Sequence, residues 1–270
     1  MNKKNIKKEH KQLFIALVIY FIYFGIVLLA NVLMRESILT GNKNFEEISG
    51  ILFGFIGIPI FSLILPLWLA KKWQLPYSFW PKSKNWILVV LVLLIYSFLS
   101  NSELTKIALN SGISIRDFAI HFISSMFFHV TYYALFAVFM FPILRKNFGL
   151  AKGLLLTSLA FALYHLAQFH FFPTGTTLNM QVILFIVFAI NLLFYLWSES
   201  IILVALLHSL NGAMGLIANG TLFNEIDIVF YLAIIFIIMF FGYMIQQELK
   251  HRKKAEFDAD WWLQISIKDK

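Results

Sequence analysis

The chain has 270 residues, of which 60% are hydrophobic and only 13% charged, and its mean hydropathy is +0.79. A soluble domain must carry more charge on its surface, so this composition excludes the soluble globular class and indicates a membrane protein. We read the net charge of +8 as a result of membrane topology, which excludes nucleic acid as a partner. With no cysteine in the chain, disulfides, thiolate metal sites and cysteine nucleophiles are also excluded.

Apolar segments of spanning length recur along the whole chain. A membrane-spanning helix needs about 20 mostly apolar residues, because its backbone groups must be satisfied within the segment. Pro59 and Pro66 lie in the second segment and predict a kinked helix. We expect an all-α bundle of eight spans, at residues 13–34, 48–70, 86–99, 118–144, 150–172, 180–197, 201–218 and 228–245.

The basic residues predict the orientation of these spans. Lys and Arg are retained in short cytoplasmic segments, and eight spans place 18 of the 22 basic residues on one side. We therefore expect a multi-pass protein of the cell membrane with both termini cytoplasmic. The tail after the last span, residues 246–270, is expected either to lie on the lipid surface with its tryptophans at headgroup level or to be partly disordered.

Three histidines fall inside predicted spans, each at least two turns from an end: His129, His165 and His208. Polar side chains in hydrocarbon cost several kcal/mol unless they are paired, so such residues predict a functional site. Side chains three or four residues apart share a helix face. On these faces lie further polar and aromatic candidates, namely Tyr132, Tyr133, Phe161, Gln168 and Asn211. The alternative is that these residues only join helices by hydrogen bonds.

Two motifs resemble a known family. Phe161-Ala-Leu-Tyr-His165 follows Phe141-Pro-Ile-Leu-Arg-Lys-Asn-Phe-Gly149, and Ser200-Ile-Ile-Leu-Val-Ala-Leu-Leu-His208-Ser-Leu-Asn211 comes later. Together they resemble the CPBP family of CAAX-protease and bacteriocin-processing proteins, also called Abi-type. The resemblance divides the chain into an N-terminal three-span segment (1–117), a CPBP-like core (118–218), and a last span with a basic tail (219–270).

The family carries EExxxR, FxxxH and HxxxN or HxxxD motifs, whose glutamate and histidine activate a water for peptide hydrolysis in the membrane. By resemblance, the second motif is intact and His165 and His208 are the catalytic histidines of an active protein. The third motif ends at Gly212, with Asn211 beside it as a partial substitute. The two glutamates fall on Tyr132 and Tyr133, and the arginine falls on Ala137.

Neither carboxylate of the first motif is therefore present. A water is a poor nucleophile unless a base takes its proton or a metal lowers its pKa. Tyrosine, with a reference pKa near 10, is a weak substitute for glutamate as a base. The acid nearest to a histidine in sequence within the core is Glu199, which lies nine residues before His208 and on the opposite helix face. We expect no cofactor; the alternative is zinc held by His129, His165 and His208.

The sequence leaves three functions open, and with them whether the protein is an enzyme. The first is a bacterial CPBP homologue without peptidase chemistry, a pseudoprotease that binds a membrane peptide or membrane protein in regulation or bacteriocin immunity. In this hypothesis His129, Tyr132, Tyr133, Phe161, Gln168 and Asn211 line the binding site. The second is an active intramembrane endopeptidase for CAAX-like or leader peptides with a base other than glutamate. The third is a small proton-coupled transporter.

Overall fold

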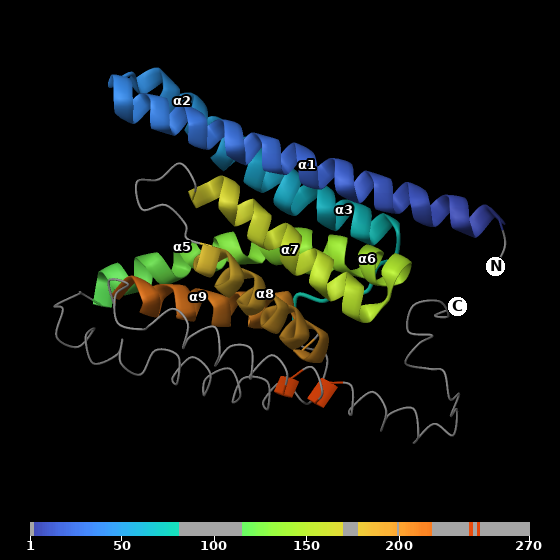
Figure 1. The fold of residues 1–270 in the computed structure, drawn as a ribbon. Helices are drawn as coiled ribbons and strands as arrows, with labels where there is room; N and C mark the ends of the chain where they lie inside the picture. Colours follow the sequence, from blue (N-terminus) through green and yellow to red (C-terminus); the bar gives the residue numbers. More distant parts are fainter. Residues whose placement is uncertain are drawn as a thin grey trace.

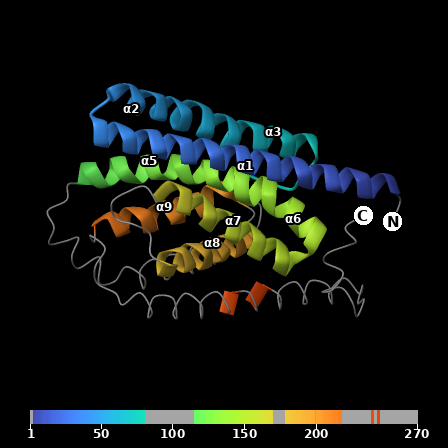
Figure 2. The same ribbon diagram turned by 45° about the horizontal axis from the view of Figure 1, so that its top comes forward.

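A computed structural model describes residues 3–80, 115–169, 178–198 and 200–217, with 238–239 and 242–243. Every regular element in these ranges is a helix. A long helical hairpin lies along one side of the molecule, and the remaining helices pack beside and beneath it (Figures 1 and 2). The all-helical fold agrees with the prediction from the apolar segments, because a helix satisfies its backbone groups internally in lipid.

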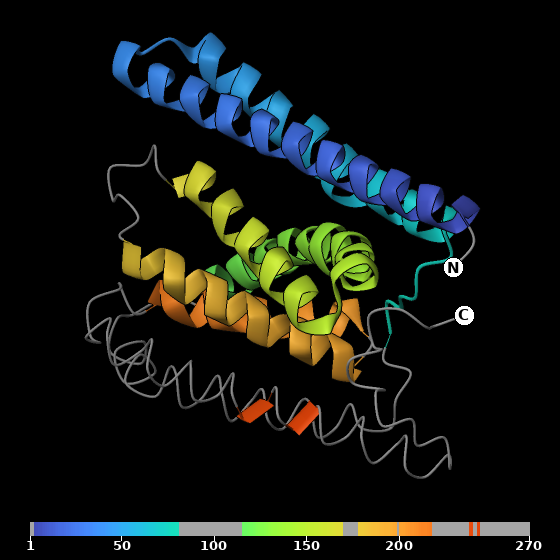
Figure 3. The same ribbon diagram turned by 45° about the vertical axis from the view of Figure 1, so that its right-hand side comes forward.

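The outer hairpin consists of α1 (Lys3–Thr40) and a returning arm made of α2 (Lys43–Gly50), η1 (Ile51–Ile64) and α3 (Leu65–Lys72). The turn between its arms is built by two residues. Gly41 has φ +68°, which a side chain would resist, and its N–H donates to the carbonyl of Ser37 at 2.8 Å. Asn42 then caps α2 by accepting the N–H of Asn44 at 3.1 Å. Figure 3 shows the two arms side by side.

The returning arm contains both prolines of the second predicted span. Pro59 lies within η1, which is a π-helix, and the N–H of Leu65 donates to the carbonyl of Ile60, five residues back. Proline cannot donate the usual bond, and a wider turn accommodates the missing donor without breaking the span. Pro66 is the second residue of α3, which continues directly from the π-helical segment η1.

The central helices begin with α5 (Ile115–Tyr133), which continues as a π-helical segment η2 (Ala134–Met140) and as α6 (Phe141–Phe148). Then follow α7 (Leu150–Phe169), α8 (Leu178–Ser198) and α9 (Ile201–Ile217). Gly149, with φ +85°, ends α6 and turns the chain into α7. The two helices approach so closely that a Cβ on Gly153 would lie 2.7 Å from the backbone of Arg145.

The start of α9 is held by the segment that follows α3. The N–H groups of Ile201 and Ile202 donate to the carbonyls of Ser78 and Phe79 at 3.1 and 3.2 Å. The Ser200 hydroxyl donates to the same Phe79 carbonyl at 2.8 Å. The first N–H groups of a helix have no partner within it, so these carbonyls fix both the position and the direction of α9.

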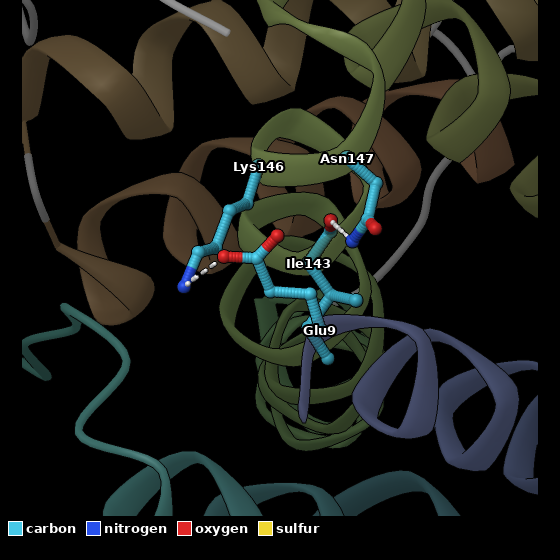
Figure 4. Close-up of polar contacts among 4 residues, drawn as sticks. All are labelled: Glu9, Ile143, Lys146 and Asn147. Atoms are coloured by element: carbon cyan, nitrogen blue, oxygen red, sulfur yellow. Dashed lines mark hydrogen bonds and ion pairs between the residues drawn. The ribbon is translucent and has the colours of Figure 1, made fainter. Parts of the chain in front are cut away.

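One ion pair joins the outer hairpin to the central helices. Glu9 of α1 accepts from Lys146 of α6, with Oε1 3.3 Å from Nζ, and Asn147 caps its own helix through the carbonyl of Ile143 at 2.7 Å (Figure 4). The basic N-terminal head and the basic residues in the last turn of α6 therefore lie at the same end of the bundle, as the charge pattern predicts. Which side of the membrane this end faces stays a prediction.

Most predicted spans coincide with helices. The segments 13–34, 48–70, 118–144, 150–172, 180–197 and 201–218 match α1, the returning arm, α5 to α6, α7, α8 and α9. By length and composition, three described helices can cross a membrane: Glu9–Thr40, Lys43–Lys72 and Phe122–Phe148. The segment 86–99 and most of 228–245 lie outside the described residues, so the count of eight stays a prediction.

Candidate functional site

The three histidines that the sequence predicts to lie inside spans come together where α5, α7 and α9 meet. His129 of α5 and His208 of α9 stack face to face, with ring centroids 3.8 Å apart and planes 14° apart. His165 of α7 joins them through Phe161, whose ring centroid lies 4.1 Å from that of His165 and 6.3 Å from that of His208. Residues that are far apart in the sequence thus form one group of rings.

Tyr133 bonds directly to one of these histidines. Its hydroxyl lies 2.9 Å from Nδ1 of His208, and its side chain is fully buried. The tyrosine ring also stacks on Phe188 of α8, at 5.8 Å between centroids and 8° between planes. Phe188 stacks in turn on Phe161 at 3.8 Å. The aromatic packing holds the Tyr133 hydroxyl in place against His208.

Tyr132 lies between the other two histidines. The centroid of its ring is 5.9 Å from that of His129 and 5.9 Å from that of His165, both in edge-to-face geometry. Its oxygen accepts a hydrogen bond from the hydroxyl of Tyr164 at 3.2 Å. We call the group of His129, Tyr132, Tyr133, Phe161, His165 and His208 the histidine–tyrosine cluster.

Hydrogen bonds select the tautomers of two histidines. The Nδ1 of His165 lies 3.0 Å from the carbonyl oxygen of Phe161, which only accepts, so this nitrogen carries the hydrogen. Ser209 gives its one hydroxyl hydrogen to the carbonyl of Ala205 at 2.7 Å, so its oxygen accepts from Nδ1 of His129 at 2.8 Å. Neutral His129 and His165 therefore each carry their lone pair on Nε2.

The geometry does not favour the zinc site considered from the sequence. A tetrahedral zinc needs nitrogen lone pairs that converge on one point. The rings of His129 and His208 instead lie one above the other, and Nδ1 of His208 is engaged by Tyr133. Within the described residues, no group of three or more His, Cys, Asp or Glu side chains is placed to hold a metal ion.

Two predicted site residues cannot be compared with this geometry. The side chains of Gln168 and Asn211 lie outside the described part of the structure. Conversely, sequence reasoning missed Tyr164, Phe188 and Ser209, which contact the cluster. A signal was available for Tyr164, since a phenol in mid-span needs a hydrogen-bond partner. Phe188 carried no comparable signal, because it is one of 30 phenylalanines in the chain.

A family comparison bears on this cluster. The family model described as "Type II CAAX prenyl endopeptidase Rce1-like" matches residues 134–214. This segment is Rce1-like, of the CPBP type. The match includes Phe161, His165 and His208 and begins directly after Tyr133. The resemblance drawn from these sequence motifs is thereby confirmed. No curated protein and no solved structure matches the chain.

The Rce1-like segment supplies only part of the cluster. Phe161, His165 and His208 come from the matched residues, whereas His129, Tyr132 and Tyr133 come from α5 just before them. Tyr132 and Tyr133, which the motif resemblance places where the family has two glutamates, contact His165 and His208 respectively.

Proposed function

We propose that this protein is a CPBP-type intramembrane protein without peptidase chemistry, which binds a membrane peptide or the spanning segment of another membrane protein at the histidine–tyrosine cluster. The observation that carries the proposal is the 2.9 Å bond between the Tyr133 hydroxyl and His208. A phenol takes the hydrogen-bonding position next to a family histidine, where hydrolysis needs a carboxylate to activate water.

The difference between the two groups is large. At neutral pH a glutamate with a reference pKa near 4.3 is ionised, whereas only about one tyrosine in a thousand is, with a reference pKa near 10. The general base of a peptidase takes the proton of the attacking water, so its basic form must be abundant. Tyr132 and Tyr133 in their neutral forms donate and accept hydrogen bonds instead. Those are the interactions of a binding site.

The cluster suits a peptide backbone within the membrane. A peptide that is locally unwound in lipid has N–H and C=O groups in need of partners, each costly if unsatisfied. An imidazole nitrogen accepts hydrogen bonds from peptide N–H groups, and a phenol hydroxyl donates to carbonyls. Phe161 and Phe188 supply apolar contacts for side chains. A membrane peptide is therefore the class of ligand that we assign to this site.

The test uses the full-length protein in liposomes with a library of 20-residue apolar peptides, each carrying one benzophenone. Photocrosslinking measures binding, and mass spectrometry measures cleavage. We expect crosslinked but uncleaved peptide. His208→Ala should lower the yield about tenfold, because it removes the hydrogen bond that holds the Tyr133 hydroxyl in the cluster. Leu206→Ala is the matched control, because Leu206 is a partly exposed residue of the same helix. Unchanged crosslinking in His208→Ala contradicts the proposal.

An active endopeptidase is the second candidate, favoured by one observation. The bond from His165 to the carbonyl of Phe161 leaves a basic nitrogen on His165, and histidine is a common general base. The same assay separates the two functions. Peptide cleavage by the wild-type protein that disappears in His165→Ala would replace our proposal with this one.

A double substitution tests whether the absence of the two motif glutamates explains the absence of peptide hydrolysis. Tyr132→Glu with Tyr133→Glu returns both glutamates of the motif beside the intact His165 and His208. We expect this variant to cleave library peptides and His165→Ala in its background to be inactive. A double variant that folds and binds peptide without cleaving it would show that the two tyrosines are not what prevents hydrolysis.

A further inference from the structure

A row of three phenols links the outer hairpin to the histidine–tyrosine cluster. Tyr23 of α1 donates from its hydroxyl to that of Tyr164 on α7 at 3.2 Å, and Tyr164 donates to Tyr132 on α5 at 3.2 Å. Tyr23 and Tyr164 are fully buried, and Tyr132 is 5% exposed. We call these three residues the tyrosine row. It joins three helices that come from distant parts of the sequence.

The packing around the row leaves its rings little freedom. Tyr23 and Tyr164 stack with centroids 5.2 Å apart and planes 10° apart. The ring of Tyr164 also meets that of Tyr132 edge to face at 5.4 Å. On the other side of Tyr23, η1 comes close at Gly57, where a Cβ would lie 3.6 Å from the ring and 3.2 Å from Ile26. The hydroxyls are thus held in order by fixed rings.

A row of this kind lowers the free-energy cost of placing phenol hydroxyls in hydrocarbon. An unpaired hydroxyl in an apolar medium costs free energy, and each member of the row satisfies the next. Donation from one hydroxyl also makes the receiving hydroxyl a better donor, so the bonds reinforce one another. Because the oxygen of Tyr132 accepts from Tyr164, the hydrogen of Tyr132 is directed away from Tyr164. The row thereby sets the orientation of a hydroxyl within the cluster.

We propose that α1 is part of the binding site: Tyr23 and Tyr164 are positioning residues that fix the orientation of the Tyr132 hydroxyl within the cluster that binds the membrane peptide. This inference rests on the proposed function for its ligand, but its structural part stands by itself. Tyr23 lies 111 residues before the segment 134–214 that matches the family model. The Rce1-like segment is then incomplete as a site without the first helix.

The chain offers a closely matched control in Tyr20. Like Tyr23, it is a buried tyrosine of α1 whose hydroxyl donates to α7, in this case to the carbonyl of Ala160 at 2.8 Å. Tyr20→Phe removes one hydrogen bond between the same two helices without touching the row. A role confined to holding α1 on α7 would make Tyr20→Phe and Tyr23→Phe equivalent.

The experiment places 3-fluorotyrosine at position 132 of the full-length protein in nanodiscs and records its ¹⁹F resonance. We expect Tyr164→Phe to move the resonance by more than its linewidth, Tyr23→Phe to move it less, and Tyr20→Phe to leave it in place. In the liposome assay, Tyr164→Phe and Tyr23→Phe should lower crosslinking about three- to tenfold, the effect of one hydrogen bond, and Tyr20→Phe should not.

The outcomes separate the two proposals. Equal ¹⁹F resonances in Tyr23→Phe and Tyr20→Phe overturn the positioning role, whatever the peptide does. Absence of peptide crosslinking to the wild-type protein overturns the proposed function but leaves the ¹⁹F result to be judged by itself. Should Tyr164→Phe fail to fold, Tyr23→Phe still decides, since it changes the row at its far end and only through Tyr164.

Discussion

The outer hairpin and the central helix that contains α5 and η2 are both apolar enough to span a membrane, yet they are buried to different extents. In the most apolar window, 72% of the residues of Phe122–Phe148 are buried, against 33% for Glu9–Thr40 and 22% for Lys43–Lys72. The buried helix is also the least hydropathic of the three. In lipid the order known from soluble proteins is reversed, because hydrocarbon accepts apolar surface and polar groups must find partners inside.

This comparison teaches where substitutions should matter. The central helices hold rings and hydroxyls in fixed contacts, so a lost group leaves a cavity or an unpaired partner. The hairpin presents side chains such as Phe55, 75% exposed, that lipid replaces at little cost. The first three of the following tests make a comparable change in each region, and the fourth changes a contact between them. Stability is measured by reversible unfolding in mixed micelles.

The largest difference is expected for a deleted phenylalanine. Phe161→Ala removes a ring that is 1% exposed and stacked on Phe188 and His165, and should cost about 3–5 kcal/mol. Phe55→Ala on the hairpin should cost less than about 1 kcal/mol, because its ring has few protein contacts to lose. Similar losses in both variants would remove the distinction between the two regions.

Glycine substitutions should have opposite signs in the two regions. The Cβ of Gly153→Ala would lie 2.7 Å from the backbone of Arg145, so α6 and α7 must separate, at a cost of about 1–3 kcal/mol. Gly54→Ala has nothing within 4 Å of its new Cβ and should stabilise η1 by up to about 1 kcal/mol. A neutral Gly153→Ala would indicate that the tight turn yields without strain.

The loss of one buried hydroxyl should give a smaller difference in stability cost between the two regions. Tyr133→Phe removes the partner of His208 Nδ1 and should cost about 1–3 kcal/mol, since a buried nitrogen is left unpaired. Ser49→Ala in the hairpin loses a 2.7 Å bond to the carbonyl of Ala30, which keeps its bond within the helix, and should cost about 0.6 kcal/mol. Equal costs would mean that His208 finds another partner.

The smallest effect is expected where the two regions meet. Lys146→Gln breaks the ion pair with Glu9, in which the lysine side chain is 54% exposed, and should change stability by less than about 0.5 kcal/mol. Lys152→Gln, which removes the charge of another exposed lysine, serves as the control. The wild-type protein in 1 M salt should resemble Lys146→Gln, because salt screens exposed pairs. A loss above 1 kcal/mol would make this contact a main link between the regions.

The sequence predicts the spans and the importance of the three histidines for one reason. Both follow from the cost of placing polar groups in lipid, which a single segment already displays. The stack of His129 on His208 does not follow, because the spacing within α5 cannot say that α9 lies beside it. The role of Tyr164, which is next to His165 in the sequence, does not follow either, because it depends on Tyr23 in another helix.

The bonds at the start of α9 have a consequence for biosynthesis. Ser200 and Phe79, joined at 2.8 Å, are separated by 121 positions along the chain. At translation rates of about 5–20 residues per second, Ser200 is synthesised roughly 6 to 24 seconds after Phe79. During that interval the segment after α3 must stay accessible while α5 to α8 are inserted. The helix that carries His208 is thus among the last to find its place, and until it does the cluster does not exist.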